Sequence, residues 1–273
     1  MAKLNRLKIQ IISTLITNFK LDNFFSGKIY KGFTKNLCSP GLNCYSCPAA
    51  GFACPIGAMQ AVSGGRKFNI PFYVFGFLMS IGIIFGRMVC GFLCPFGLIQ
   101  DLLNKLSKIN LKIPKFFKYI KYIMLIFLVL ILPIIYSTDI LLADPYYCKY
   151  VCPAGILEGA FPLIMTNKNL KSALGNLFYI KSITLALIIF LSIIIYRPFC
   201  KVLCPLGAFY AFFNKISIIK LELDESKCIS CNKCNNVCKM DVEFTKNQNA
   251  LECIRCNECK NICPTNAITI KRK

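Results

Sequence analysis

Histidine and tryptophan are both absent from this chain of 273 residues. Without histidine, the chain has no His-ligated haem, Rieske centre, His-based zinc site or Ser/Cys–His nucleophile. A phosphate-binding glycine loop, a nucleotide fingerprint and a general acid–base pair are missing as well. Acidic residues are scarce, because 12 Asp and Glu stand against 33 Lys and Arg, for a net charge of +21. The sequence therefore predicts no haem and no catalytic residue.

Apolar residues are abundant, at 56% of the chain with a mean hydropathy of +0.56. Such a composition is typical of an integral membrane protein. Residues 1–219 hold 23 basic and 5 acidic residues, whereas residues 220–273 hold 10 and 7. A basic membrane domain favours contact with anionic lipid headgroups. Nucleic acid is not an expected partner, because no basic patch stands apart from the apolar runs.

Long uncharged runs predict three strong transmembrane helices and one weak one. A hydrocarbon core of about 30 Å requires about 20 apolar residues. The uncharged run Ile9–Phe19 is shorter, so residues 7–25 are either a weak span or an interfacial helix. The three strong spans are Phe68–Gly86, Tyr122–Thr138 and Gly175–Tyr196.

Eighteen cysteines are present, and the sharpest pattern among them lies near the C-terminus. Two runs of four follow the Cys-x2-Cys-x2-Cys-x3-Cys spacing of bacterial two-cluster ferredoxins, in which the fourth cysteine of each run ligates the other cluster. A zinc ribbon fits less well, since it uses two pairs of cysteines. The predicted ligands are Cys228, Cys231, Cys234 and Cys263 for cluster 1, and Cys253, Cys256, Cys259 and Cys238 for cluster 2.

A second cysteine pattern occurs twice, each time directly after an apolar run. The first copy is Arg87-Met-Val-Cys90-Gly-Phe-Leu-Cys94-Pro95, and the second is Arg197-Pro-Phe-Cys200-Lys-Val-Leu-Cys204-Pro205. In a helix, cysteines four residues apart share one face. Two such pairs together supply the four thiolates of an iron–sulfur cluster. We therefore expect an inner-face cluster held by Cys90, Cys94, Cys200 and Cys204.

The shorter signature Cys-Pro-x-Gly occurs four times, at Cys54, Cys94, Cys152 and Cys204, with one predicted span between consecutive copies. Motif and span alternate, which indicates an internal duplication of about 110 residues. The alternation predicts that Cys54 and Cys152 lie across the bilayer from Cys94 and Cys204. The candidates for an outer-face cluster are Cys38, Cys44, Cys47, Cys54, Cys148 and Cys152. Disulfides are the alternative for these six, although an anaerobe would exert little pressure to form them.

Orientation follows from the positive charges and from the tail. Lysines and arginines are concentrated before the first run and after Cys94, which favours the cytoplasm for both segments. An exported iron–sulfur module would need special handling, so the tail is also expected in the cytoplasm. The predicted fold is an α-helical, multi-pass integral plasma-membrane protein with an internal duplication. Its domains are residues 1–219 in the membrane and residues 220–273 as an α+β two-cluster ferredoxin.

With these motifs in place, the chain resembles the NapH/NosR/CcoG-type membrane-bound polyferredoxins. The resemblance covers nearly the whole chain and rests on the paired Cys-x3-Cys-Pro motifs and the two-cluster tail. It implies electron transfer, through [4Fe-4S] clusters, between a redox partner and an oxidoreductase system. A quinone pool or a flavoprotein is the expected kind of partner. The outward cysteines are additions that the nitrate-reductase-type members need not share.

Two functions are consistent with this pattern. The first is an electron conduit that relays electrons between cytoplasmic partners and partners in the membrane or at its outer face. The alternative is an accessory or maturation factor that supplies electrons to the metal centre of a partner oxidoreductase. A redox sensor and a solute transporter fit less well, because no output domain remains and intramembrane charges are scarce.

Overall fold

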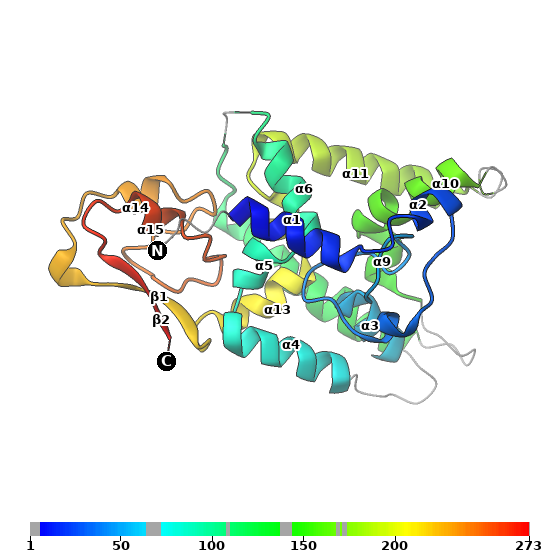
Figure 1. The fold of residues 1–273 in the computed structure, drawn as a ribbon, viewed down its shortest axis with the longest axis horizontal. Helices are drawn as coiled ribbons and strands as arrows, with labels where there is room; N and C mark the ends of the chain where they lie inside the picture. The colour runs from blue at the N-terminus through cyan, green and yellow to red at the C-terminus, as the bar shows by residue number, and fades with distance from the viewer. Residues whose placement is uncertain are drawn as a thin grey trace.

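The computed structural model describes residues 6–63, 72–107, 110–136, 144–167, 170 and 174–272. The molecule is elongated (Figure 1): the C-terminal module forms one end, and helices α4 and α11 run along the long axis on opposite sides. The first half of the chain contains α1 (Arg6–Thr17), α2 (Asn23–Ser26), η1 (Phe33–Asn36), α3 (Pro55–Ser63), α4 (Phe72–Phe85), α5 (Met88–Phe92) and α6 (Pro95–Asn104).

The second half of the chain continues with short helical segments and then the tail. Its helices before the tail are η2 (Lys115–Tyr119), α7 (Ile120–Ile123), η3 (Met124–Ile131), α8 (Leu132–Ile135), α9 (Tyr146–Tyr150), η4 (Gly155–Ala160), α10 (Phe161–Thr166), α11 (Asn176–Ile194), α12 (Pro198–Val202) and α13 (Pro205–Phe213). The tail contains β1 (Ile219–Leu223), η6 (Glu225–Lys227), α14 (Lys233–Asn236), α15 (Glu258–Ile262) and β2 (Ile268–Arg272).

Two helices in the described ranges are long and apolar enough to cross a membrane, and their bounds are Lys115–Ile135 and Asn176–Ile194. The first combines η2 to α8 and has a mean hydropathy of 2.2; the second is α11, at 2.3. Of the predicted span Phe68–Gly86, the described part is α4, with 14 residues, and residues 68–71 lie outside the description. Residues 137 and 138 of the span Tyr122–Thr138 lie outside it too.

The weak span predicted for residues 7–25 is not one helix. Helix α1 has 12 residues and ends at Thr17, so at 1.5 Å per residue it measures about 18 Å. The chain then turns, and the four-residue α2 follows. Gln10 and Thr17 are buried, because α1 packs along α5 and α6. Polar residues on this helix thus face the protein interior, where they find partners.

The Cys-x3-Cys pairs do not lie on one continuous helix, which corrects the sequence prediction. Cys90 is in α5, whereas Cys94 precedes α6 with an extended backbone at φ −85° and ψ 117°. Cys204 has the same role before α13. A residue before proline is pushed out of the α region, and proline is well suited to the first position of a helix. The Cys-Pro step therefore ends one short helix and begins the next.

The tail is a two-stranded antiparallel sheet with two short helices. Strands β1 and β2 pair with Leu221 opposite Ile270, and a small core forms from Leu221, Phe244 and Ile268. The two cysteine runs share an unusual backbone. In each run, the residue before the second cysteine and the residue after it both have positive φ. These residues are Ser230, Asn232, Arg255 and Asn257. Such turns wind successive N–H groups around a concave site that suits an anionic cluster.

Candidate metal centres

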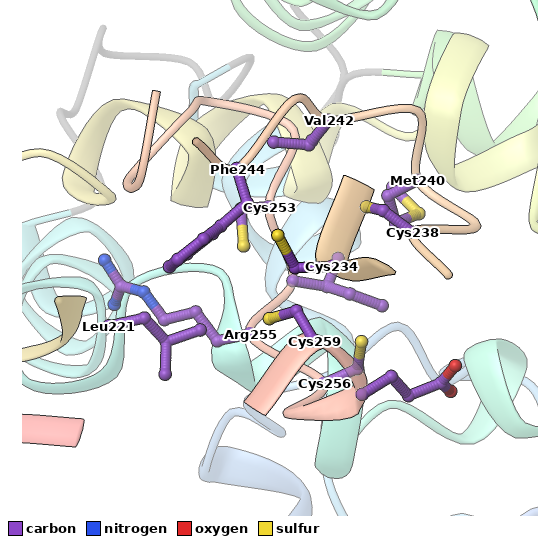
Figure 2. A pocket seen from close by; sticks show the side chains of 12 residues that line it. Leu221, Cys234, Cys238, Met240, Val242, Phe244, Cys253, Arg255, Cys256 and Cys259 are labelled. Carbon is purple, nitrogen blue, oxygen red and sulfur yellow. The ribbon is translucent and has the colours of Figure 1, made fainter. Parts of the chain in front are cut away.

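Five cysteines of the tail line one cavity, which Figure 2 shows from close by. Cys238, Cys253, Cys256 and Cys259 line it, together with Cys234 and the apolar side chains of Met240, Val242, Phe244 and Ile254. Burial raises the pKa of Cys256 to about 11. Burial also raises the pKa of Cys259, and the nearby thiols of Cys256, Cys253 and Cys238 raise it further. The structure thus brings together the four residues predicted for cluster 2.

The residues predicted for cluster 1 lie at the surface of the tail. Cys231 is exposed, and Cys228, Cys234 and Cys263 are half-buried. Burial raises the pKa of Cys234, and the thiols of Cys231 and Cys228 contribute to the shift. Cys234 and Cys263 both pack against the small core of the tail. Cluster 1 is therefore the site in this chain that is most accessible to solvent.

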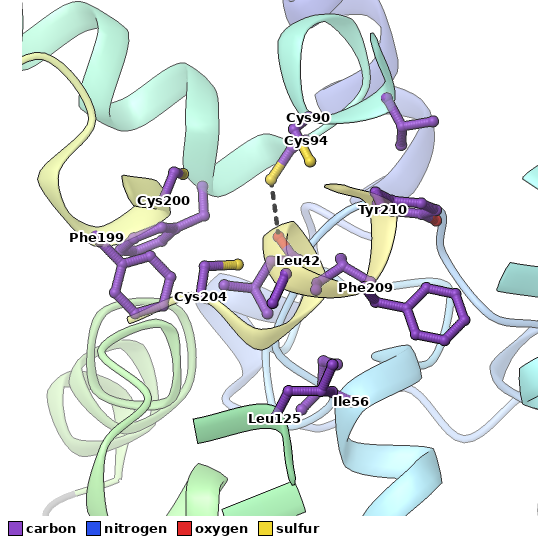
Figure 3. Packing of buried hydrophobic residues seen from close by; sticks show 14 of the residues in the cluster. Leu42, Ile56, Cys90, Cys94, Leu125, Phe199, Cys200, Cys204, Phe209 and Tyr210 are labelled. Atoms are coloured by element: carbon purple, nitrogen blue, oxygen red, sulfur yellow. Dashed lines mark hydrogen bonds between the residues drawn. The ribbon is translucent and has the colours of Figure 1, made fainter. Parts of the chain in front are cut away.

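The two duplicated motifs meet in the interior and form what we call the central quartet, which consists of Cys90, Cys94, Cys200 and Cys204 (Figure 3). All four residues are buried. Burial raises the pKa of Cys94, with contributions from Cys200 and Cys90. For Cys204, burial raises the pKa and the thiols of Cys200, Cys90 and Cys94 raise it further. Four thiols that oppose one another's ionisation require a cationic core if all four are to be thiolates.

Two fully buried arginines connect the copies of the duplicated motif. Arg87 of the first copy donates through Nη2 to the carbonyl oxygen of Cys200 (3.0 Å). Arg197 of the second copy donates through Nη1 to the carbonyl oxygen of Cys90. Each has a carboxylate partner, since Arg87 pairs with Glu252 at 2.7 Å and Arg197 pairs with Asp101 at 2.6 Å. The two arginines therefore link the two copies of the motif inside the protein and are not anchors at a membrane interface.

Four of the six remaining cysteines gather in a second interior set, the loop quartet, which consists of Cys44, Cys54, Cys148 and Cys152. Burial raises the pKa of Cys148 to about 12, and the Cys54 thiol adds to the effect. The pKa of Cys152 is raised by burial and then by Cys148, Cys54 and Cys44. The Cys54 copy has Ala50 where the other copies have a cysteine, and Cys44 supplies the fourth thiol of this set.

Cys38 and Cys47 lie beside this quartet and not within it. Cys38 borders Cys54 and lines a groove with Ile12, Pro40 and Leu93. The Cys47 sulfur is 3.8 Å from the Asn18 Oδ1 atom. Sequence reasoning left all six cysteines as candidates for four places, and it had no means of choosing among them. All eighteen cysteines of the chain are free in the structure.

The two quartets are linked by direct contacts between the residues beside them. The fully buried Tyr147 is next to Cys148 in sequence, and its hydroxyl donates to the carbonyl oxygen of Leu203, the residue before Cys204 (3.2 Å). A Cβ on Gly41 would lie 2.7 Å from the Cα of Cys94. The segment that carries Cys38 and Cys44 folds inward against the central motif, because its apolar residues, such as Leu42, complete the core.

The central quartet also adjoins cluster 2 of the tail. A Cβ on Gly91 would lie 2.7 Å from the carbonyl oxygen of Ile254, between Cys253 and Cys256. Asn214 donates through Nδ2 to the carbonyl oxygen of Cys253 (2.8 Å), and Arg255 donates through Nη2 to that of Asn214 (2.6 Å). Cluster 1, cluster 2, the central quartet and the loop quartet therefore form a continuous series.

Glutamines contact two of these thiols, and sequence reasoning did not single them out. Gln100 donates through Nε2 to the Cys200 sulfur (3.1 Å), and Gln60 does so to the Cys148 sulfur (3.3 Å). Each follows a Cys-Pro cysteine by six residues, and Glu158 and Tyr210 occupy this position in the other two copies. The recurrence of polar residues at one spacing in four copies was the available signal.

The residues fit a four-iron cluster better than a single ion. Among the residues that the structure describes, no three His, Cys, Asp or Glu side chains converge closely enough to hold one metal ion. A cubane cluster separates its four ligand sulfurs further than a tetrahedral ion does, since Zn–S bonds are only about 2.3 Å long. Four buried thiols without a histidine also match the donor set of a [4Fe-4S] cluster.

Comparison with protein families gives matches at the four Cys-Pro-x-Gly copies and at the second run of the tail, whereas Cys38, Cys44, Cys47 and the first run of the tail lie outside the matches. A 4Fe-4S binding domain matches residues 51–73, 72–114, 122–161 and 179–223, so that each match contains one Cys-Pro-x-Gly copy. Together these matches cover more than half of the chain. The chain belongs to this 4Fe-4S binding family. A second 4Fe-4S binding domain matches residues 248–269 in the tail.

Curated relatives are consistent with this family. An uncharacterised protein of Methanocaldococcus jannaschii is 30% identical, over 63% of this chain and 59% of its own length. The methylamine utilization ferredoxin-type protein MauN of Methylobacillus flagellatus is 27% identical, over 67% of this chain and 60% of its own. The putative electron transport protein YccM of Escherichia coli is 27% identical, over 61% and 45%. The chain thus spans about three fifths or less of these three proteins. No solved structure matches it.

Proposed function

We propose that this chain is a membrane-bound electron relay with four [4Fe-4S] clusters in series. The observation that carries the proposal is the continuous contact from the exposed Cys231 of cluster 1, through cluster 2 and the central quartet, to the loop quartet. Cluster 2 and the central quartet meet where Gly91 lies against Ile254, and the central and loop quartets meet where Tyr147 donates to Leu203. Electron tunnelling is short-range, so such spacing favours transfer along the whole series.

In this proposal, the clusters and the protein residues have separate roles. The clusters supply the electron-accepting chemistry when bound. The chain's own residues bury the thiols of the central quartet away from solvent, place Arg87 and Arg197 beside it, and keep the four sites in contact. Relatives named as electron transport and ferredoxin-type proteins support this role. The finer assignment to the NapH/NosR/CcoG type, with a quinone pool or flavoprotein as partner, is part of the proposal.

Iron and acid-labile sulfide analysis of anaerobically purified protein tests the number of clusters. We expect about 16 iron and about 16 sulfide per chain, since each of four sites holds four of each. Cys204→Ser and Cys152→Ser should each lower the iron content by about four, and EPR of the reduced protein should retain the tail signals. A parent chain with only about eight iron would limit the relay to the ferredoxin tail and overturn the proposal.

We further propose that the chain is a multi-pass plasma-membrane protein with its tail in the cytoplasm. The two apolar helices support this placement, as does the excess of basic residues in residues 1–219. The membrane fraction should retain the protein through an alkaline carbonate wash. Protease added to inverted vesicles should remove the tail, whereas protease added to spheroplasts should leave it intact; the opposite result would reverse the orientation.

A further inference from the structure

Gln60 and Gln100 occupy the same position in two copies of the repeated motif. Gln60 is the sixth residue of α3, which begins at Pro55, and Gln100 is the sixth residue of α6, which begins at Pro95. Both side chains are buried, at 0% and 1% exposure. A buried amide requires hydrogen-bond partners, so the contacts of each side chain indicate what it does.

The two amide nitrogens make matching hydrogen bonds. The oxygens differ, since Gln60 Oε1 accepts from the backbone N–H of Tyr147 (2.8 Å) and Gln100 Oε1 has no hydrogen-bond partner among the described residues. Each Nε2 donates to the carbonyl oxygen four residues earlier, at 3.1 Å to Ile56 and 3.5 Å to Phe96. Each also donates to a cysteine sulfur of another copy of the motif. Gln60 donates to Cys148, which belongs to the Cys152 copy, and Gln100 donates to Cys200, which belongs to the Cys204 copy. Since both neighbouring atoms are acceptors, the nitrogen and not the oxygen of each amide must face the sulfur.

We propose that Gln60 and Gln100 are positioning residues that set the reduction potentials of the loop and central clusters, through one N–H···S hydrogen bond each. This inference rests on the proposed function, because it needs a cluster at each quartet. Reduction adds one negative charge to a cluster and its thiolates. An N–H donor aimed at a ligand sulfur stabilises that charge, so it raises the reduction potential.

The other two copies show that the position is used in different ways. Glu158 accepts through Oε2 from the backbone N–H of Cys44 (2.7 Å). Tyr210 donates through its hydroxyl to the carbonyl oxygen of Pro40 (3.0 Å). Each quartet thus has one glutamine that donates to a sulfur and one side chain that holds the neighbouring loop. Gln60 and Gln100 are therefore the matched pair for an experiment.

The test is a redox titration of anaerobic protein, followed by EPR, for the parent chain and for Gln60→Met and Gln100→Met. Methionine has a similar length and flexibility but no N–H donor. Cys152→Ser and Cys204→Ser identify the signals of the loop and central clusters. We expect Gln100→Met to shift the redox equilibrium of the central cluster about tenfold towards the oxidised form, which is about 59 mV for one electron.

Gln60→Met should shift the loop cluster in the same direction and leave the central cluster unchanged, so each variant is the control for the other. No shift in either variant, or an equal shift of both clusters in each, would overturn the inference. Gln60→Leu and Gln100→Leu provide a second substitution in case methionine prevents assembly. Loss of the same cluster in both substitutions would assign the glutamine to assembly and reject a tuning role.

The iron analysis separates this inference from the proposed function. A parent chain with about eight iron contradicts the four-cluster relay itself. A parent chain with about 16 iron whose potentials do not respond to the glutamine variants leaves the relay standing and contradicts the present inference alone.

Discussion

At the scale of single residues, each buried arginine beside the central quartet has a carboxylate partner. Arg197 donates two hydrogen bonds to Asp101, and Arg6 and Gln10 also donate to this carboxylate. Burial opposes ionisation of Asp101, but Arg197 and Arg6 outweigh it and lower the pKa of this carboxyl to about 2. Because these groups are shielded from water, removing one partner leaves an expensive unpaired charge.

Arg197→Met should therefore destabilise the chain by about 3–5 kcal/mol, since it leaves the Asp101 carboxylate without its main partner. Thermal unfolding in detergent, followed by far-UV circular dichroism, measures the loss. The double variant Arg197→Met with Asp101→Leu should recover part of the stability, because the buried carboxylate is then absent and Arg6 keeps Glu258 as a partner at 3.4 Å. If Arg197→Met unfolds at the same temperature as the parent chain, Arg6 alone is a sufficient partner for the Asp101 carboxylate.

Replacement of one central cysteine tests the assignment of thiols at the same scale. Cys94→Ser should remove one cluster and leave both tail clusters, because Cys94 lies beside Cys90, Cys200 and Cys204 and far along the chain from the tail ligands. Iron content and EPR measure the result. Cys47→Ser is the matched control, since Cys47 lies outside both quartets and its loss should leave the iron content unchanged. A loss of tail signals in Cys94→Ser would contradict the assignment.

At the scale of elements, close backbone approach joins the membrane domain to the tail. Gly91 in α5 lies against the backbone of Ile254 so closely that a Cβ would stand 2.7 Å from its carbonyl oxygen. A backbone atom cannot move aside as a flexible side chain can. Helix α5 therefore accepts only glycine at this point, and the position of the tail depends on it.

Gly91→Ala should push the Ile254 loop away from α5 and weaken the docking of the tail. We expect faster release of the tail under limited proteolysis and slower electron exchange between cluster 2 and the central cluster. Gly76→Ala in α4 is the control, since nothing lies within 4 Å of a Cβ there and alanine favours a helix by about 0.5–1 kcal/mol over glycine. Equal release rates in the two variants would exclude a role for the close contact.

At the scale of the whole molecule, we expect residues 1–219 and the tail to depend on metal to different degrees. A single large core joins the helices and both quartets. Within the described residues, the tail has a separate core of only three buried side chains, Leu221, Phe244 and Ile268, whereas Met240, Val242, Cys253 and Ile254 of the tail join the large core. Small domains with little apolar burial depend on metal for much of their folding free energy.

Iron removal by an anaerobic chelator should therefore unfold the tail before the membrane domain. Limited proteolysis should cleave residues 220–272 in the iron-free chain, while circular dichroism retains most of the helical signal. Reconstitution with iron and sulfide should restore protection of the tail. A tail that resists protease equally with and without iron would show that its apolar core suffices.

The sequence predicted the features that depend only on short stretches of the chain. The spacing in Cys228–Cys238 and Cys253–Cys263 is typical of clusters because a few intervening residues restrict where the thiols can point. Proline after Cys94 and Cys204 places a helix start there. The same reasoning considered both thiols of each Cys-x3-Cys pair on one face of a helix, because it gave the periodicity of four more weight than the conformational restriction before proline.

Only the tertiary structure decided which thiols share a site and how near the sites are to one another. Cys44 replaces the cysteine that is missing at Ala50, and Tyr147 reaches Leu203 across 56 positions of sequence. These contacts arise from packing between segments that are distant in the chain, and local spacing carries no information about them. The sequence by itself determined the chemistry of the thiols, and the packed core decided that four sets of them form one series.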